Sequence, residues 1–459
     1  MSAAAPTGPA SVPSTTVEQG DSPELWASLR RPLPDWYADA RLGIFVHWGP
    51  YSVPAWAEPV GALGAVPEDE WFLHNAYAEW YWNTIRIDGS PAQRHHAEVH
   101  GGAPYDDFLD AWTAADFDPA AWARLFAAAG AEYVVPTTKH HDGVALWDAP
   151  GTGARNTVHR GPRRDLVGEI ADAVRAEGMR FGVYYSGGLD WSVTDLPPHT
   201  TFDEVSTLRP TDAAYNLYAG AHVADLIRRY APSVLWNDID WPDSGKRGGP
   251  GSLHALFEDY YAAVPEGVVN DRWGDTHHDF VTSEYEHKRE HEGDEPWEHN
   301  RGIGWSFGHN QVEDESQSLD ARALARHLTD VVSRGGRLLL NVGPTADGTL
   351  PPVQQRALEG LGRWMGAAKE LLRTSSLVAV GTARAGDEPW TRWLAVPGAL
   401  VAVVDGDGAV PLDVERSAVD PGDLTVVNGS ADVTVEEGRL VARVTPSPDG
   451  PALLRLPAR

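Results

Sequence analysis

Cysteine is absent from the sequence of 459 residues, and basic side chains are scarce. Without cysteine, the fold uses neither disulfides nor thiolate chemistry. Lysine and arginine number 37 against 66 aspartates and glutamates, which gives a formal net charge of -29. A chain this acidic lacks the clustered cations that neutralise phosphates, which argues against nucleic acid or an anionic membrane as partner. A neutral or weakly charged ligand fits better.

Long apolar runs are missing too, because no stretch reaches the ~18 uninterrupted apolar residues of a membrane-spanning helix. The opening "MSAAAPTGPASVPSTTVEQG" has neither the basic start nor the apolar run of a signal peptide. Its composition predicts a disordered leader at 1–20. The lack of cysteine suits a reducing cytosol without excluding export. We therefore expect a cytoplasmic protein.

What the sequence does contain is a series of short apolar runs that end in polar or aromatic residues. Helical periodicity fills several gaps between them: "RDLVGEIADAVRAEG" places Leu166, Ile170 and Val174 four residues apart. Strands that alternate with helices predict a parallel sheet, and eight strands suggest a (β/α)8 barrel. The eight runs are "LGIFVHWG", "EYVVPTTKHHDG", "RFGVYYSGGLDW", "SVLWNDIDW", "GVVNDRW", "DFVTSEY", "IGWSFGHN" and "RLLLNVGPT".

The gaps on either side of the sixth run lack a good helical pattern, so we expect an irregular TIM-like barrel over 21–370. From about residue 375 the sequence pattern changes to that of short strands with Gly, Asp and Pro at the turns. These strands predict a C-terminal antiparallel β-sandwich at 375–459. They are "TRWLAVPG", "ALVAVVDG", "LTVVNG", "GRLVARVT" and "ALLRLP".

In such a barrel the residues just past the carboxyl ends of the strands form the active site. Here they are mainly tryptophan, tyrosine, histidine and acidic residues. Flat rings, imidazoles and carboxylates together describe a pocket for a sugar. The strand-end residues include His47, His140, His141, Tyr184, Trp236, Asp238, Asp240, Arg272, Glu284 and Trp305.

Hydrolysis of a glycoside needs two carboxyl groups, and Asp238 and Glu284 end two of the predicted strands. Asp238 could instead cap a helix or form a salt bridge, but Trp236 and Trp241 beside it favour a pocket. On spacing alone Asp240 could share its role. Glu284 competes with nearby glutamates: Glu286, Glu290, Glu292, Glu295 and Glu298.

The motif "KHHDG" allows a metal site as an alternative, since imidazole and carboxylate suit zinc or iron. However, the sequence lacks the i, i+4 histidine pair of the common metalloprotease signature. We favour hydrogen bonds from these histidines to substrate hydroxyls, and we predict neither a metal nor a cofactor.

Several motifs, in one order, closely resemble the α-L-fucosidases of glycoside hydrolase family 29. They are "WYADARLGIFVHWGPYSVPAW", "AEWYWNTIR", "YVVPTTKHHDGVALWD", "RDLVGEIADAVRAEGMRFGVYYSGGLDW", "VLWNDIDWP", "VVNDRWG", "TSEY" and "GGRLLLNVGPTADG". The resemblance covers roughly residues 35 to 365. It implies a (β/α)8-like barrel with a C-terminal β-sandwich and a retaining, exo-acting hydrolysis that needs no metal. The implied substrate is a fucosylated oligosaccharide or glycoconjugate.

The resemblance also assigns roles to residues. It implies that Asp238 of "WND" is the nucleophile and that Glu284 of "SEY" is the acid/base, which leaves Asp240 outside the reacting pair. Phe307 is expected along the face of the sugar's methyl group. The other implied fucose contacts are His47, Glu79, Trp80, His140, His141, Tyr184, Trp236 and Arg272.

The sequence departs from the family pattern at three places. Val144 stands where an aromatic residue is common, Asp240 stands where glycine is common, and "EYEHKREHEGDEPWE" matches little. An unpaired Asp240 would raise the pKa of Asp238.

Two alternative functions remain at this point. One is a related glycosidase acting on an α-L-galactoside, and the other is a sugar-binding protein without catalysis. A homo-oligomer stays open.

Overall fold

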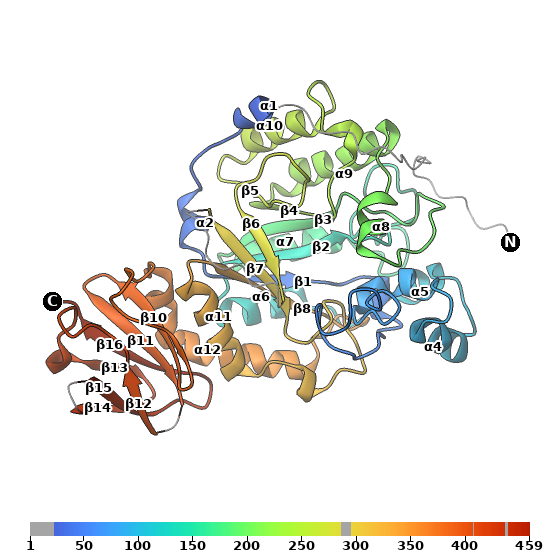
Figure 1. The fold of residues 1–459 in the computed structure, drawn as a ribbon. Helices are drawn as coiled ribbons and strands as arrows, with labels where there is room; N and C mark the ends of the chain where they lie inside the picture. Colours follow the sequence, from blue (N-terminus) through green and yellow to red (C-terminus); the bar gives the residue numbers. More distant parts are fainter. Residues whose placement is uncertain (1–22, 286–294, 407, 437–438) are drawn as a thin grey trace.

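The computed structural model describes residues 23–285, 295–406, 408–436 and 439–459, so the predicted leader at 1–20 lies outside the described residues. Its larger part is built on a curled sheet of eight parallel strands (Figure 1). The strands are β1 Leu42–Val46, β2 Tyr133–Lys139, β3 Arg180–Ser186, β4 Val234–Asp238, β5 Val268–Val269, β6 Val281–Glu284, β7 Trp297–Gly302 and β8 Arg337–Val342.

The strand order is β5-β4-β3-β2-β1-β8-β7-β6, which is the cyclic order of a (β/α)8 barrel. In the described residues β5 and β6 share no strand pairing, so the barrel is open there. Hydrogen bonds nevertheless cross this seam: the Asp279 amide donates to the Val269 carbonyl at 2.9 Å, and the Thr282 amide donates to Asp271 at 3.1 Å. The irregular barrel predicted from the sequence is confirmed.

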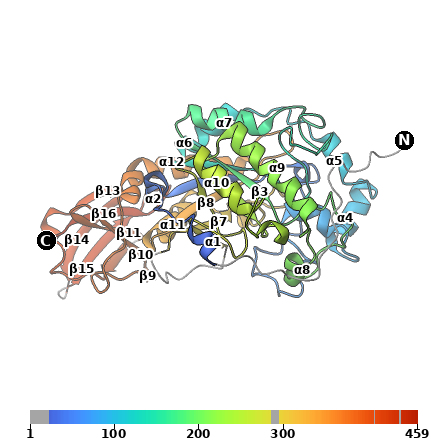
Figure 2. The same ribbon diagram turned by 90° about the horizontal axis from the view of Figure 1, so that it is seen from above.

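Helices cover the outer face of the sheet (Figure 2). The helix predicted at "RDLVGEIADAVRAEG" forms as α7, which begins after Asp165, whose carboxylate accepts the Gly168 amide at 2.9 Å. None of the helices in the described ranges has the length and hydropathy needed to cross a membrane. The longer ones are α4 Pro91–His100, α6 Pro119–Ala128, α7 Leu166–Ala176, α9 Ala213–Tyr230, α10 Leu253–Ala263, α11 Ala321–Ser333 and α12 Pro352–Arg373. The short ones are α1 Pro23–Ala27, α2 Asp35–Asp39, α3 Tyr81–Thr84, α5 Asp106–Ala111 and α8 Phe202–Thr207.

The seventh strand was placed wrongly from the sequence. "IGWSFGHN" at 303–310 is a loop, and the strand is the preceding "WEHNRG" of β7. This strand escaped a search for apolar runs because its side chains are mostly polar, yet Glu298, His299 and Asn300 are buried. Hydrogen bonds inside the fold support two of them: Glu298 accepts from Trp236 at 2.9 Å, and His299 Nδ1 bonds the Ser283 hydroxyl at 2.8 Å.

After α12 the chain forms two antiparallel sheets, β13-β16-β11-β10-β9 and β12-β15-β14, with an apolar core between them. The five predicted strands are present as β10, β11, β13, β15 and β16, and three others, β9, β12 and β14, were missed. The bounds are β9 Gly386–Asp387, β10 Trp390–Val396, β11 Ala399–Asp405, β12 Gly408–Leu412, β13 Thr425–Asn428, β14 Ser430–Glu436, β15 Arg439–Thr445 and β16 Ala452–Pro457.

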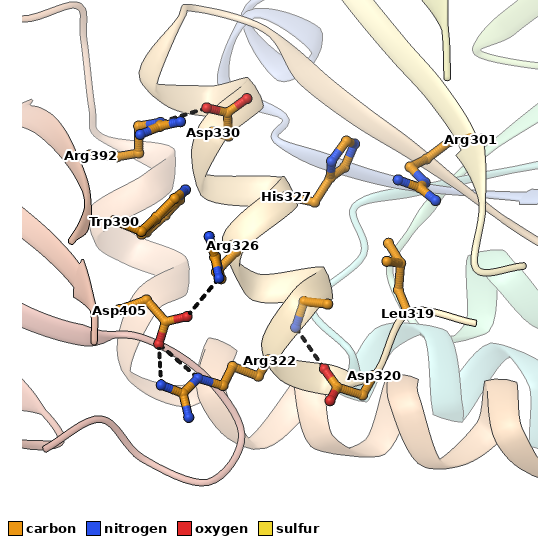
Figure 3. Close-up of a pocket in the computed structure, with 11 residues that line it drawn as sticks. Arg301, Leu319, Asp320, Arg322, Arg326, His327, Asp330, Trp390, Arg392 and Asp405 are labelled. Carbon is orange, nitrogen blue, oxygen red and sulfur yellow. Dashed lines mark hydrogen bonds and ion pairs between the residues drawn. The ribbon is translucent and has the colours of Figure 1, made fainter. Parts of the chain in front are cut away.

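The sandwich lies against α11 and α12 (Figure 1). Between α11 and the sandwich a hollow of about 540 Å³ is lined largely by charged side chains. Figure 3 shows Arg322 and Arg326 of α11 reaching Asp405, at 2.6 and 3.3 Å, and Arg392 of β10 reaching Asp330 of α11. Ion pairs thus connect the two parts of the chain.

Candidate active site

A cavity of about 210 Å³ at the carboxyl ends of the barrel strands is lined by every residue to which the family resemblance assigns a role, whereas Asp240 and Trp305 do not line it. The residues with an assigned role come from β-strand ends and from the segments that follow them, far apart in the sequence. The eleven are His47, Glu79, Trp80, His140, His141, Tyr184, Trp236, Asp238, Arg272, Glu284 and Phe307.

Strand β4 shows why the chain places an acid here. Side chains along a strand alternate in direction, and Val234 and Trp236 pack in the barrel interior while Leu235 packs in the layer between sheet and helices. Asp238 is the next inward position after Trp236 and ends the strand. Its carboxylate therefore lies at the top of the barrel, above the aromatic interior.

Asp238 is only 8% exposed, and its carboxylate is held from both sides. One oxygen accepts from Arg272 Nη1 at 3.0 Å, and the other accepts from the Tyr184 hydroxyl at 2.8 Å. Burial raises the pKa of Asp238, but the Arg272 guanidinium and the Tyr184 hydroxyl outweigh burial, so the pKa lies below its usual value. Asp238 is thus ionised and oriented at neutral pH.

Glu284 is connected to Asp238 through the same arginine. Arg272 Nη2 donates to Glu284 Oε2 at 2.9 Å, while the Tyr77 hydroxyl donates to Glu284 Oε1 at 3.0 Å. The Arg272 Nε also donates to the Thr282 hydroxyl at 3.1 Å, which fixes the guanidinium across the open seam of the barrel. One planar cation therefore sets the relative position of two carboxylates.

The loop after Asp238 has a strained backbone, with φ of 60° at Ile239 and 82° at Asp240. It is fixed because the Asp240 amide donates to the Arg272 carbonyl at 3.0 Å and Asn237 Nδ2 donates to the Asp240 carbonyl at 2.7 Å. Gly188 is required beside it, since a Cβ there would lie 1.8 Å from the Ile239 carbonyl oxygen.

Asp240 is not among the residues that line the cavity. Its carboxylate pairs with Arg209 Nη2 at 2.9 Å and with Lys246 Nζ at 2.7 Å. Asp240 is therefore not the unpaired charge that would raise the pKa of Asp238, because two cations pair with it.

The three histidines of the pocket are neutral hydrogen-bonding groups. His47 Nδ1 donates to Asn341 Oδ1 at 2.7 Å, which leaves the Nε2 lone pair for a ligand. Burial lowers the pKa of His47 to about 4 and that of His141 to about 3, and it lowers the pKa of His140 well below its usual range. Neutral imidazoles suit the recognition of sugar hydroxyls.

Glu79 is buried in η2 Ala78–Trp80, and its Oε2 accepts from the Gly308 amide at 2.7 Å. Burial raises the pKa of Glu79 to about 8. The side chain is therefore mostly protonated at neutral pH and offers the pocket both a donor and an acceptor.

The Trp236 ring packs against two of the residues that hold Asp238. Its ring stacks on Tyr184 with centroids 5.6 Å apart and lies 4.7 Å from the Arg272 guanidinium carbon. Its Nε1 donates to Glu298 Oε1 at 2.9 Å, and Glu298 Oε2 accepts from the Tyr37 and Tyr133 hydroxyls. A buried carboxylate thus fixes the ring that supports both Tyr184 and Arg272.

The structure separates Glu284 from two of its competitors. Glu295 is paired with His278 at 2.8 Å and does not line the cavity, and Glu298 lies in the barrel interior. Glu286, Glu290 and Glu292 lie outside the described residues. Over the described ranges, no three His, Asp or Glu side chains are grouped so as to hold a metal ion.

Sequence reasoning missed several residues of the pocket. Tyr77, which contacts Glu284, precedes Glu79 by two residues, and only its proximity to a recognised motif could have suggested it. Asn300 was missed because β7 was misplaced. The remaining additions are apolar: Phe45 in β1, Leu63, Trp71 and Phe72 before η2, Phe202 and Val205 in α8, and Ile239 directly after β4.

Two carboxylates on one arginine, in an aromatic pocket at the carboxyl end of a (β/α)8 barrel, define a glycoside hydrolase. A model of the family described as alpha-L-fucosidase matches residues 11–370. The chain belongs to the alpha-L-fucosidase family.

Named relatives agree with this assignment. The tissue alpha-L-fucosidase of Homo sapiens is 35% identical over 360 residues, which cover 76% of this chain and 71% of the human one. The crystal structure of the Thermotoga maritima alpha-fucosidase is 41% identical with a TM-score of 0.82, and the match covers 94% of this chain and 99% of that one. The Thermotoga maritima alpha-fucosidase in complex with fucose gives a TM-score of 0.81 at 38% identity, again covering 94% and 99%.

Proposed function

We propose that this α-L-fucosidase is a retaining, exo-acting enzyme in which Asp238 is the nucleophile and Glu284 is the acid/base. The observation that carries the proposal is the bridge from Arg272 to both carboxylates, at 3.0 and 2.9 Å. One guanidinium that contacts both acids keeps them close together, as a retaining pair requires. The cavity of about 210 Å³ suits a single terminal sugar.

In the first step the ionised Asp238 attacks the anomeric carbon of a terminal α-L-fucosyl unit, and Glu284 gives its proton to the departing oxygen. The glycosidic bond breaks as the bond to Asp238 forms. In the second step Glu284 removes a proton from water, which attacks the anomeric carbon and releases fucose and Asp238. The substrate is a fucosylated oligosaccharide or another fucoside.

The surrounding residues support these two roles. Arg272 and Tyr184 hold Asp238 ionised, and hydrogen bonds that tighten in the transition state contribute most to the rate. His47, His140, His141 and Glu79 are placed to bind the hydroxyls. Phe307 packs 5.0 Å from His47 and 5.4 Å from Tyr77, centroid to centroid, and supplies an apolar wall for the methyl group.

The test is hydrolysis of 4-nitrophenyl α-L-fucoside by the wild type and by Asp238→Gly, with and without azide. We expect kcat of the variant to fall by at least about 10³-fold, because no nucleophile remains. Azide should restore turnover and yield β-fucosyl azide. Glu315→Ala, at an exposed carboxylate away from the cavity, is the control. An Asp238→Gly enzyme with unaltered turnover would refute the assignment.

A further inference from the structure

One side of the active-site cavity is lined by six aliphatic or aromatic side chains that take no part in holding the two carboxylates. We call this set the apolar collar; it consists of Leu63, Trp71, Phe72, Phe202, Val205 and Ile239. Phe202 is 37% exposed, so the collar leads from the cavity to solvent.

The collar begins beside the proposed acid/base. Trp71 packs edge-on against Tyr77, with ring centroids 5.1 Å apart, and the Tyr77 hydroxyl donates to Glu284. The departing oxygen receives its proton from Glu284, so the group attached to that oxygen extends past Trp71. Ile239, directly after Asp238, borders the same space from the barrel side.

From there the collar continues to a second segment of the chain. Phe72 packs edge-on against Phe202 of α8, with ring centroids 4.9 Å apart, and Val205 lies one helical turn further along α8. The loop before η2 and the loop after β3 therefore meet through hydrocarbon. No salt bridge or side-chain hydrogen bond in the described residues joins them at this contact.

The apolar side chains of the collar determine which leaving groups it can bind. A sugar in the leaving-group position would bring hydroxyls that need partners, and burying them without partners costs free energy. Among the six side chains only the Trp71 indole carries a polar atom. Alkyl or aromatic surface, in contrast, is stabilised by removal from water.

We propose that the apolar collar is a leaving-group subsite that selects α-L-fucosides of alkyl or aromatic alcohols over fucosides of hydroxyl-rich sugars. This proposal rests on the proposed function, because it takes Glu284 as the group that protonates the departing oxygen. The leaving alcohol gains binding free energy when its apolar surface packs against the collar and is removed from water.

The test compares kcat/KM of the wild type on methyl, butyl and hexyl α-L-fucosides, whose leaving alcohols have similar acidity. We expect kcat/KM to rise by up to about fourfold for each methylene that enters the collar. We also expect cyclohexyl α-L-fucoside to be cleaved more efficiently than a fucosyl-galactose of equal ring size. A kcat/KM that does not change from methyl to hexyl fucoside, or a higher kcat/KM for the fucosyl-galactose than for cyclohexyl fucoside, would overturn the proposal.

A variant pair shows whether the collar causes the effect. Phe202→Ala should flatten the ratio of hexyl to methyl kcat/KM, whereas Leu217→Ala, at another exposed apolar residue, should leave it unchanged. An unchanged ratio in Phe202→Ala would contradict the proposal. If the wild type cleaves methyl fucoside without a chain-length effect, only the collar subsite fails. If it cleaves neither methyl nor 4-nitrophenyl fucoside, the proposed function itself fails.

Discussion

At the scale of single residues, Arg272 has the largest electrostatic effect on the site. Its guanidinium lies between the two carboxylates and above the Trp236 ring. Burial alone would favour a neutral Asp238, and the positive charge reverses that preference. The arginine therefore sets the lower pH limit at which Asp238, the proposed nucleophile, is ionised.

Replacing Arg272 with methionine removes this charge but keeps much of the side-chain volume. The pKa of Asp238 should rise, so the acidic limb of the kcat/KM profile should move up by about one to three pH units. The profile of 4-nitrophenyl fucoside hydrolysis measures the shift. Arg356→Met, at an exposed ion pair with Glu315, is the matched control. An acidic limb that stays in place would show that Arg272 does not set the ionisation of Asp238.

Glu79 is the opposite case, since burial raises its pKa to about 8 against roughly 4.3 in an unfolded chain. Between these two values the folded state binds one more proton than the unfolded state. The free energy of unfolding should therefore fall as pH rises through this window, by at most about 1.4 kcal/mol per pH unit.

Glu79→Gln keeps the shape of the protonated acid and removes the titration. Urea unfolding at pH 5, 6.5 and 8 should show a smaller loss of stability with rising pH in the variant than in the wild type. Equal slopes would mean that Glu79 is ionised in the folded protein. Asp39→Asn, at an exposed carboxylate, serves as the control.

At the scale of elements, β7 connects the barrel interior to the active site. It reads as polar in sequence, but Glu298 is fully buried and fixes Trp236 by a 2.9 Å hydrogen bond. Trp236 in turn supports Tyr184 and Arg272. A polar strand of the barrel thus positions the two residues that hold the Asp238 carboxylate.

Glu298→Leu should leave the Trp236 indole and two tyrosine hydroxyls without their acceptor. We expect the free energy of unfolding to fall by about 1–3 kcal/mol for a buried group left unsatisfied, and kcat to fall with it. Tyr37→Phe removes one donor to the other Glu298 oxygen and keeps the Trp236 bond, so its kcat should change less. Equal kcat in both variants would exclude the positioning role of Glu298.

At the scale of the whole molecule, the barrel and the sandwich are joined through α11. Asp405 of β11 is buried, accepts a hydrogen bond from Arg322 and forms an ion pair with Arg326, as Figure 3 shows. Asp387, in contrast, pairs with Arg392 while its side chain is 87% exposed. The same type of ion pair therefore occurs here in a buried and in an exposed setting.

Asp405→Asn should lower the free energy of unfolding by about 1–3 kcal/mol, because hydrogen bonds to a buried charge are lost. Asp387→Asn should change it by less than about 1 kcal/mol, since water already screens that pair. Thermal unfolding compares the two, and kcat on 4-nitrophenyl fucoside should stay at the wild-type value in both. Equal melting temperatures would show that the buried pair does not stabilise the contact.

The sequence alone determined helices such as α7 and α9 and strands such as β4, because helical apolar periodicity and buried apolar runs are local patterns. It also placed Asp238 at the end of a predicted strand. In a barrel, residues at that position form the active site. The family motifs supplied Glu79 and Trp80, which no strand end marks.

The tertiary structure alone decided the rest. Strand β7 could not be read as a strand, because it buries polar side chains, and the partners that Glu298 finds in the fold, Tyr37 and Trp236, are distant in sequence. The pairing of Asp240 with Arg209 and Lys246 and the bridge from Arg272 to both acids depend on the same kind of distant contact. Local pattern fixes which element a residue belongs to, but only folding brings together the charges that set its pKa and its role.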